Sequence, residues 1–573
     1  MEQTAVSGIN ETQVETILET LRFHLPSQVN HRNVNKMSRR VRSCTSRWGV
    51  VCATAAFLLI GPTQAESSTG PTLDEPIHMP TMTDTSTLDV VIVEGWHVDT
   101  IDGTTRQKLI NIHVDDWWEG VEIRVPVRLV VPLEGTVEGF VITGSGLNET
   151  PGDDEAMTPS DRVALDAGAG VVTTKIRSLN NGYYPDLPSP GIVQARFAQT
   201  LDWRYSEYFL WSAIMMRAIT AAFDDELFQP GPVIAYGNSK NGMTPLISSI
   251  HDDRITAVRS THAFTTYTPI RAHEPTAVAE VEAANEAFAA AFQADDLPEG
   301  DQPWSYYDKG FQNFIEAAET SGWSSNEALA AIDRFADDLY VSENWDELTA
   351  RGVEIFTLPG SHDWVAYDVP GVGVELPGLR TYIVPNGGHA RNGHSEAPSK
   401  DVDAAFFAEQ LAGADRGLET PEVSTVVMGD TLVVTVTFPD GGVPGESKIF
   451  WMYDRGPDGS SWYLYDLIPE ENWAIMNGSG STWTASIPLD SGHASIDLIT
   501  THTVTVNGRI IPISAPYTRV ALASTVPFLS PPAIWLLAAV LAAWGTSLSR
   551  LVNRSQRSAD ALAETSGRAK QGT

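Results

Sequence analysis

The stretch that decides the fold is "AYGNSKNGMTP", residues 235–245. It follows a short apolar run, precedes a segment of helical character, and places Ser239 between Gly237 and Gly242. A sharp strand-to-helix turn of this kind can hold a serine hydroxyl out at the end of a strand. The usual spacing is G-x-S-x-G, and here Asn241 stands where the second glycine is expected. Serine is also a favoured helix cap, so a purely structural role for Ser239 stays open from this stretch alone.

The surrounding sequence alternates strands with helices. "EIRVPVRLVVP", "EGFVITGSG" and "AGVVTTKIRS" have strand character, "YFLWSAIMMRAITAAFDDE" is helical, and "GPVIAYGN" and "ITAVRSTHAF" are strands again. The sheet returns at "VEIFTLPGSHDW" and "LRTYIVPNGGHARNGH", before a last helix at "DVDAAFFAEQLAG". This pattern predicts an α/β fold, a mostly parallel sheet covered on both faces. We assign it to residues 88–418, with an Ala- and acid-rich helical insertion at about 273–350.

Residues 419–522 change to an all-β pattern. "STVVMGDTLVVTVTFP", "SKIFWMYDRG" and "STWTASIPL" are strands with turn signals between them. Short strands about ten residues apart predict a β-sandwich of immunoglobulin or fibronectin type.

The N-terminal region has the pattern of a secretory signal. From Met37 a basic segment precedes an apolar run over about 48–60, and Ala65 is the expected cleavage position. The resulting assignments are an upstream extension (1–36), a signal peptide (37–65) and a linker rich in Ser, Thr and Pro (66–87).

The C-terminal segment, 526–573, predicts a membrane helix. Ala533 to Val552 is mostly apolar and about long enough to cross a bilayer. Trp535 and Trp544 suit its interfaces, and arginines follow, so the tail is expected in the cytoplasm and the body outside. The segment also resembles bacterial C-terminal sorting signals, in which the helix can be cleaved after export.

Composition limits the classes of function. Of 573 residues 42% are hydrophobic, enough for more than one core. The formal net charge of −36 argues against nucleic-acid binding, which needs a basic surface, and fits a soluble extracytoplasmic body. Both cysteines, Cys44 and Cys52, fall in the predicted signal peptide. The mature body is therefore expected to use no disulfide, thiol nucleophile or thiolate metal site.

Three strand ends supply the groups that acyl transfer needs. A serine hydroxyl is a weak nucleophile and needs a histidine base, which needs an acid to fix its tautomer. Ser239 follows "PVIAY", Asp363 follows "VEIFTLPGSH" and His389 follows "LRTYIVPNGG". This is the chain order of α/β-hydrolases, in which each group comes just after a strand. The sequence thus predicts Ser239 as nucleophile, Asp363 as acid and His389 as base, with no metal and no cofactor.

Other residues compete for these roles or accompany them. Asp368 is a second candidate acid and His394 a second candidate base. His362 is expected to orient or pack, and His262, at the end of another strand, could line the pocket. A zinc site is conceivable, but no H-E-x-x-H or similar spacing occurs.

An oxyanion hole needs two backbone N–H groups aimed at the developing charge. One is expected from Lys240, directly after the nucleophile. The other is expected from the glycine-rich "ITGSGLN" loop, at Gly144 or Ser145. An ordinary strand-to-loop turn is the alternative for that loop.

Several of these segments resemble the PhoPQ-activated pathogenicity-related protein family (PqaA type). The family has a G-x-S-K-x-G segment, a G-x-x-D turn and a P-N-x-x-H segment, matched here by "GNSKNG", "GSHD" and "PNGGH". "RYSEYFLWSAIMMRAITAA" and "SENWDELTARGVEIFTLPGSHD" are also similar, and the resemblance covers about residues 90–415. It implies an α/β-hydrolase fold with nucleophile, acid and base on Ser239, Asp363 and His389.

The family also places its second glycine one position later, which accounts for Asn241. Asparagine tolerates the unusual backbone expected in a tight turn. The family usually has Arg and Trp flanking that glycine, where this chain has Asn241 and Met243. This difference bears on substrate preference more than on chemistry.

The combined expectation is an exported serine hydrolase acting on an ester, amide or peptide bond of a small-molecule or peptide substrate. It is expected in the periplasm or at the cell surface, held by the C-terminal helix unless that helix is cleaved. The alternatives are a non-catalytic surface binding protein on a degenerate hydrolase scaffold, and a peptidase acting on cationic peptides.

Overall fold

The computed structural model describes residues 76–118, 121–176, 189–263, 265–266, 310–363, 369–389, 391–393, 395, 399–439, 441–454 and 467–522. The predicted upstream extension, signal peptide and C-terminal membrane segment lie outside these ranges. Within them, no helix combines the length and the apolar character that crossing a membrane requires.

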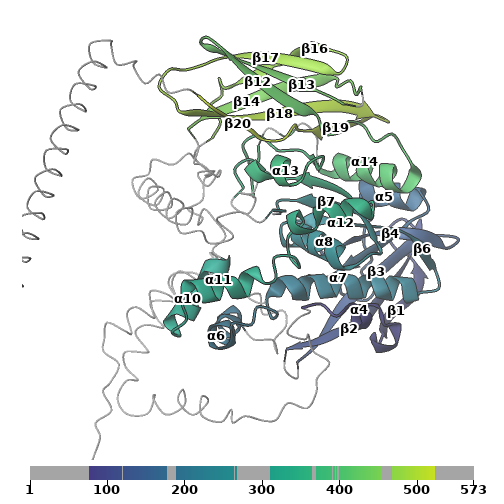
Figure 1. The fold of residues 1–573 in the computed structure, drawn as a ribbon. Coiled ribbons are helices and arrows are strands. Elements are labelled where there is room, and N and C mark those ends of the chain that lie inside the picture. The colour runs from purple at the N-terminus through teal and green to yellow at the C-terminus, as the bar shows by residue number, and fades with distance from the viewer. Residues whose placement is uncertain are drawn as a thin grey trace, which may run out of the picture. The chain divides into compact units, whose positions relative to one another are not determined.

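A nine-stranded mixed sheet forms the larger part of the fold (Figure 1). Its strand order is β1-β2-β3-β5-β4-β6-β7-β8-β9. From β5 to β9 neighbouring strands run parallel, whereas the pairs β1–β2, β2–β3 and β3–β5 are antiparallel. The strands are β1 (Val91–Val98), β2 (Thr105–Trp118), β3 (Val121–Pro132), β4 (Val137–Thr143), β5 (Gly170–Thr174), β6 (Phe228–Asn238), β7 (Ile255–Thr261), β8 (Glu354–Leu358) and β9 (Arg380–Thr381).

Helices cover both faces of this sheet, as the alternation along β4 shows. Ile142 packs in the same apolar cluster as Ile214 of α7 (Glu207–Asp224) and Leu246 of α8 (Lys240–His251). Val141, its neighbour, packs with Phe406 of α14 (Ser399–Ala412) in the cluster that also contains α5 (Pro159–Asp166). Successive strand residues point to opposite faces, so the two clusters are two cores on either side of one sheet. The predicted α/β class with a mostly parallel sheet is confirmed.

The remaining helical elements and one small sheet are short. They are α4 (Met79–Thr83), η1 (Thr85–Thr87), α6 (Pro190–Thr200), α10 (Gly310–Thr320), α11 (Ser325–Asp333), η3 (Ser342–Asn344), α12 (Trp345–Ala350), α13 (Val369–Glu375), β10 (Gly387–Gly388) and β11 (Arg391–Asn392). Of the predicted helical insertion, α10, α11, η3 and α12 fall in the described residues.

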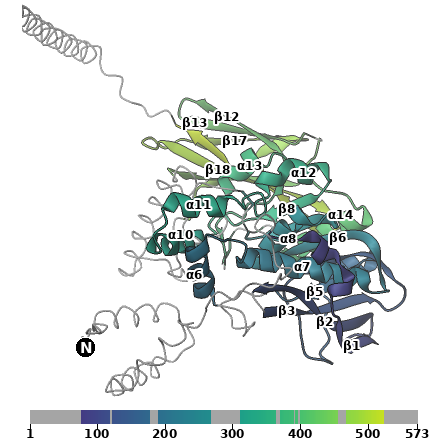
Figure 2. The same cartoon turned by 60° about the horizontal axis from the view of Figure 1, so that its bottom comes forward.

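The C-terminal strands form two antiparallel sheets, ordered β12-β13-β17-β16 and β15-β14-β18-β19, with β20 also paired to β18. In the views of Figures 1 and 2 the labelled strands β12, β13, β17 and β18 lie close together. Every second residue of β13 is buried. Because successive side chains of a strand point to opposite faces, one face of β13 lies against the core. This arrangement fits the predicted β-sandwich. Its strands are β12 (Glu422–Met428), β13 (Thr431–Thr437), β14 (Glu446–Tyr453), β15 (Trp473–Ile475), β16 (Asn477–Ser479), β17 (Thr482–Pro488), β18 (Ser495–Val506), β19 (Arg509–Ile513) and β20 (Thr518–Ala521).

The sandwich packs directly on the α/β part. Val369 and Ile383 share a buried apolar cluster with Phe450, Ile499 and other sandwich residues. Ser514, just after β19, adds polar contacts: its N–H donates to the carbonyl of residue 381 (2.8 Å), and its hydroxyl accepts from the N–H of Ile383 (3.0 Å). The sandwich therefore reaches the segment between β9 and His389.

Candidate active site

Ser239 occupies the turn between β6 and α8 in a strained backbone conformation. Its φ is 57° and its ψ −129°, a combination that costs a non-glycine residue about 1–3 kcal/mol. The N–H of Ser239 donates to the carbonyl of Thr261 (2.9 Å), and its own carbonyl accepts from the N–H groups of Gly242 (2.7 Å) and Met243 (2.8 Å). Its side chain makes no capping hydrogen bond to α8. The alternative that Ser239 only caps the helix is therefore wrong.

Two glycines let the backbones at this turn approach each other closely. A Cβ on Gly237 would lie 2.1 Å from the carbonyl oxygen of Asn241, and one on Gly242 would lie 2.7 Å from that of Thr261. No side chain fits at either distance, so the second glycine is needed where α8 passes the end of β7. Asn241 itself lies in α8. The expectation that Asn241 carries the unusual backbone is wrong, because the strained residue is Ser239.

The predicted triad residues lie at one edge of the sheet. Ser239 follows β6, Asp363 follows β8 and His389 follows β9, and β6 to β9 are consecutive parallel strands. The carboxyl ends of parallel strands meet at the same edge, which is where open α/β sheets bind ligands.

The three side chains form a continuous hydrogen-bonded chain. Oγ of Ser239 lies 2.8 Å from Nε2 of His389, and Nδ1 of His389 lies 3.0 Å and 3.3 Å from the two carboxylate oxygens of Asp363. In the tautomer that suits both contacts, the hydroxyl donates to Nε2 and the Nδ1–H donates to the carboxylate. The side chain of Asp363 is fully buried, whereas that of His389 is 23% exposed. The ring of His389 is thus partly accessible from solvent, while the carboxylate of Asp363 is enclosed.

Asp363 stays ionised despite its burial. Burial by itself would raise the pKa of this carboxyl group, but its contacts with His262 and His389 outweigh that effect and lower the pKa to about 2. At neutral pH the group is therefore a carboxylate, the form that fixes the Nδ1–H tautomer of His389 and stabilises an imidazolium.

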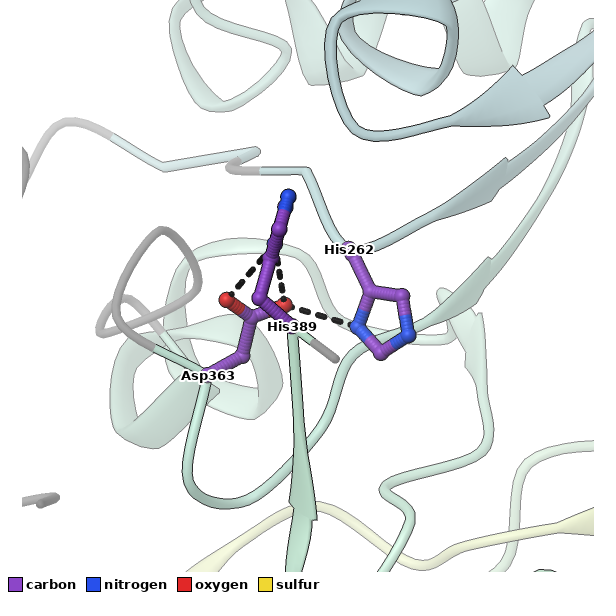
Figure 3. Close-up of side chains that lie close together, drawn as sticks. All are labelled: His262, Asp363 and His389. Atoms are coloured by element: carbon purple, nitrogen blue, oxygen red, sulfur yellow. Dashed lines mark hydrogen bonds and ion pairs between the residues drawn. The ribbon is translucent and has the colours of Figure 1, made fainter. Parts of the chain in front are cut away.

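His262, directly after β7, also contacts Asp363 (Figure 3). Its Nδ1 lies 2.7 Å from Oδ2 of the carboxylate, and its side chain is 16% exposed. Its ring centroid lies 5.6 Å from that of His389. His262 was expected at a strand end, where it could line the pocket, and the structure places its ring against Asp363.

The three residues proposed for the oxyanion hole lie around the turn. Lys240 is the first residue of α8, so its N–H has no acceptor within the helix. Gly144 and Ser145 follow β4, which pairs in parallel with β6, and the loop therefore emerges beside Ser239. A Cβ on Gly144 would lie 2.8 Å from Oδ1 of Asn241, which shows that this loop contacts the first turn of α8. Donation of these N–H groups to an oxyanion stays a prediction.

Backbone hydrogen bonds join the loop that carries Asp363 to the loop that carries His389. The N–H of Ser361 donates to the carbonyl of Val384 (3.0 Å), and the N–H of His362 donates to that of Gly387 (2.7 Å). The side chain of His362 is buried, with Nδ1 2.7 Å from Oγ of Ser361. His362 thus packs beneath the site, as expected from the sequence.

Asn386 connects these loops to the sandwich. Its N–H donates to Oγ of Ser361 (2.8 Å). Its side-chain Oδ1 accepts from the N–H of Ile468 (2.9 Å), and Nδ2 donates to the carbonyl of the same residue (3.3 Å). Asn386 is buried and has a φ of 57°, in the left-handed region that asparagine tolerates better than most residues. Its role was not anticipated from the sequence, since nothing there pairs residue 386 with residue 468.

The rival residues Asp368 and His394 lie outside the described residues. Among those described, one group with metal-ligand character is the His262–Asp363–His389 cluster itself. His389 Nδ1 faces both oxygens of Asp363 at 3.0 Å and 3.3 Å, distances of a shared hydrogen bond.

The other such group is Glu94, His97 and Asp154. Here Asp154 already accepts from the N–H of Thr100 (2.8 Å) and lies 3.5 Å from the guanidinium of Arg128. The carboxylate of Asp154 therefore already has a backbone donor and a nearby guanidinium as partners.

No protein-family model matches the chain, and no curated protein matches it. Among solved structures, an acetyl xylan esterase from Thermoanaerobacterium sp. JW/SL YS485 is 13% identical with a TM-score of 0.36, over 60% of this chain and 96% of that one. An acetyl xylan esterase from Paenibacillus sp. R4 is 12% identical with a TM-score of 0.33, over 58% and 92%. A glucuronoyl esterase from Solibacter usitatus is 13% identical with a TM-score of 0.29, over 61% and 78%.

Proposed function

We propose that the protein is a serine hydrolase that cleaves an ester or amide bond through an acyl-enzyme on Ser239. The observation that carries this proposal is the chain of contacts from Oγ of Ser239 to Nε2 of His389 (2.8 Å) and from Nδ1 of His389 to Asp363 (3.0 Å). Nucleophile, base and acid within hydrogen-bond reach are the arrangement that activates a serine hydroxyl. The strained backbone of Ser239 supports the same role, since such strain is retained mainly at functional sites.

The reaction proceeds in two acyl transfers. Oγ of Ser239 attacks the substrate carbonyl carbon as Nε2 of His389 takes its proton, and the carbonyl electron pair moves onto oxygen. When the intermediate collapses, the bond to the leaving group breaks and His389 donates the proton to it. Water then attacks the acyl-enzyme with His389 as base, which releases the carboxylic acid and restores Ser239. Asp363 stays ionised throughout and stabilises the imidazolium.

The negative oxygen of each intermediate needs donors that are in place beforehand. We assign this role to the backbone N–H of Lys240 together with one from Gly144 or Ser145. What supports it is the position of both segments, one at the start of α8 and the other in the loop beside it.

The finer assignment, to a hydrolase of the PhoPQ-activated pathogenicity-related type, rests on the "GNSKNG", "GSHD" and "PNGGH" segments. A binding protein on a degenerate scaffold has no need to keep Ser239 and His389 in contact, so their 2.8 Å separation favours an enzyme. Export and a C-terminal membrane anchor are also part of the proposal, supported by residues 37–65 and 526–573. N-terminal sequencing of the mature protein tests the cleavage after Ala65.

The decisive experiment is active-site labelling with a fluorophosphonate probe, followed by hydrolysis of a panel of 4-nitrophenyl esters and anilides. We expect stoichiometric labelling on Ser239 and its loss in Ser239→Ala. Ser486→Ala, at an exposed position of β17, is the matched control and should label like wild type. Folded protein that neither labels nor hydrolyses any member of the panel would overturn the proposal. Cationic peptides added to the panel test the peptidase alternative.

A further inference from the structure

The acid of the proposed triad has two histidine partners. His389 Nδ1 lies 3.0 Å from Oδ1 of Asp363, and His262 Nδ1 lies 2.7 Å from Oδ2 (Figure 3). The two histidines come from different strand ends, after β7 and near β10, and approach the carboxylate from different sides. Only one of these rings contacts Ser239, so the second is additional to what the acyl-transfer mechanism uses.

The backbone of His262 is held in an unusual conformation. Its φ is 52°, in the left-handed region, where a residue with a Cβ is disfavoured. Its N–H donates to the carbonyl of Leu358, the last residue of β8 (3.3 Å). The preceding residue, Thr261, accepts the N–H of Ser239. Residues 261 and 262 thus connect the turn that carries the nucleophile to the strand that leads to the acid.

The ring of His262 contacts the carboxylate of Asp363. Its buried Nδ1 lies 2.7 Å from Oδ2, at ion-pair distance, although the angles of this contact differ from those of a regular hydrogen bond. For the fully buried carboxylate, this contact replaces one of the interactions that water would otherwise supply.

We propose that His262 is a positioning residue, which fixes the orientation of the Asp363 carboxylate so that Oδ1 stays aligned with Nδ1 of His389. The proposal rests on the function proposed above. A carboxylate with a single partner can rotate about its Cβ–Cγ bond, because the terminal torsion of Asp is broad. With both oxygens engaged by rings on separate strands, that rotation would break one contact or the other.

Two substitutions separate this role from general packing. His262→Gly removes the ring and its N–H without backbone penalty, since glycine accepts a positive φ. His262→Asn removes the ring but keeps an amide N–H close to the place of Nδ1, on a residue that also tolerates this φ. Thus the asparagine variant keeps an N–H donor at position 262, and the glycine variant has no side-chain donor there.

We expect His262→Gly to lower kcat for 4-nitrophenyl acetate about ten- to a hundredfold with little change in KM, as for a small misplacement of catalytic groups. We expect His262→Asn to recover most of this loss.

Two outcomes would overturn the proposal. One is a glycine variant with wild-type kcat, or an asparagine variant as impaired as the glycine variant. The other is wild-type activity that a chelator abolishes and zinc restores, which would make the His262–Asp363–His389 cluster a metal site.

A readout that does not need activity keeps this test separate from that of the proposed function. In Ser239→Ala, the Nδ1 proton of His389 is expected as a low-field resonance in 15N-histidine-labelled protein. Adding His262→Gly should shift or broaden that resonance, and adding His262→Asn should largely preserve it. If the protein proves to have no hydrolase activity, these spectra still decide whether His262 orients Asp363. An unchanged resonance in the glycine variant would contradict the proposal.

Discussion

The side-chain amide of Asn386 binds both backbone groups of Ile468, accepting from its N–H at 2.9 Å and donating to its carbonyl at 3.3 Å. Asn386 stands three positions before His389, the base of the proposed triad, and Ile468 belongs to the sandwich part. The loop that carries His389 is therefore attached to the sandwich as well as to the α/β part. The sandwich is part of the support of the site.

Asn386→Gly removes this connection and preserves the positive φ. We expect a loss of about 1–3 kcal/mol in the free energy of unfolding, since two buried backbone groups lose their partner. We also expect kcat to fall about tenfold, because the loop of His389 is less well fixed. Asn507→Gly, at a similar φ of 51° in the turn between β18 and β19, is the matched control and should leave kcat unchanged. Equal effects of both substitutions on kcat would contradict the connection.

The backbone strain at Ser239 should be measurable as a difference in the free energy of unfolding between two variants. Ser239→Gly keeps the turn but relieves the penalty of a positive φ, and we expect it to raise the free energy of unfolding by about 1 kcal/mol over Ser239→Ala. Both variants lose the hydroxyl, so both should lose hydrolysis and probe labelling. Urea unfolding of the two proteins gives the comparison. If the alanine variant is as stable as the glycine variant, the backbone at residue 239 is not strained.

The close approach at Gly237 predicts a severe effect of a single methyl group. In Gly237→Ala the Cβ would lie 2.1 Å from the carbonyl oxygen of Asn241, so the first turn of α8 must move. We expect kcat to fall at least a hundredfold, with a loss of about 1–3 kcal/mol in stability. Gly95→Ala in β1, where nothing lies within 4 Å of the new Cβ, is the control and should behave like wild type. Activity and thermal unfolding of the pair provide the test.

His502 in β18 predicts a pH dependence of the sandwich. Burial lowers its pKa to about 3, and its ring nitrogens contact Oγ of Ser447 (2.8 Å) and Oγ1 of Thr500 (3.0 Å). Below the unfolded pKa of about 6.5 the unfolded chain binds a proton that the folded chain does not, so stability falls as the pH is lowered toward 3. By pH 5 this amounts to about 2 kcal/mol. His502→Gln should flatten this part of the curve of unfolding free energy against pH, and a curve as steep as that of wild type would refute the assignment.

Much of this architecture could be predicted from the sequence because its signals are local. Apolar runs that end in polar residues marked β6, β8 and the segment before His389, and parallel strands bring such ends to one edge. Strand β2 was not predicted. It carries Arg106, Lys108 and Asp115, charged residues that interrupt an apolar pattern, and its antiparallel pairing with β1 and β3 holds it in place.

The contacts of the site that could not be predicted from the sequence join residues that are far apart in the chain. Nothing local in the sequence pairs His262 with Asp363, 101 positions later, or Asn386 with Ile468. Such contacts depend on which loops the folded sheet brings together. The interpretation of Asn241 was wrong for a related reason. Position 242 needs glycine because a Cβ there would lie too close to the carbonyl oxygen of Thr261 at the end of β7. Thr261 lies outside the sequence motif that contains Gly242.

The hydrogen bonds between Asn386 and Ile468 also affect the stage of protein synthesis at which the site can form. Ser239 leaves the ribosome before His262, Asp363 and His389, and the residue that supports the base loop follows 79 positions after His389. A chain released up to the end of α14 holds every group of the proposed triad but not the partner of Asn386. Contacts this distant in sequence close late and slowly. Full reactivity of Ser239 is thus expected to develop only after the chain has been made past Ile468, which limits exposure of an activated serine on shorter chains.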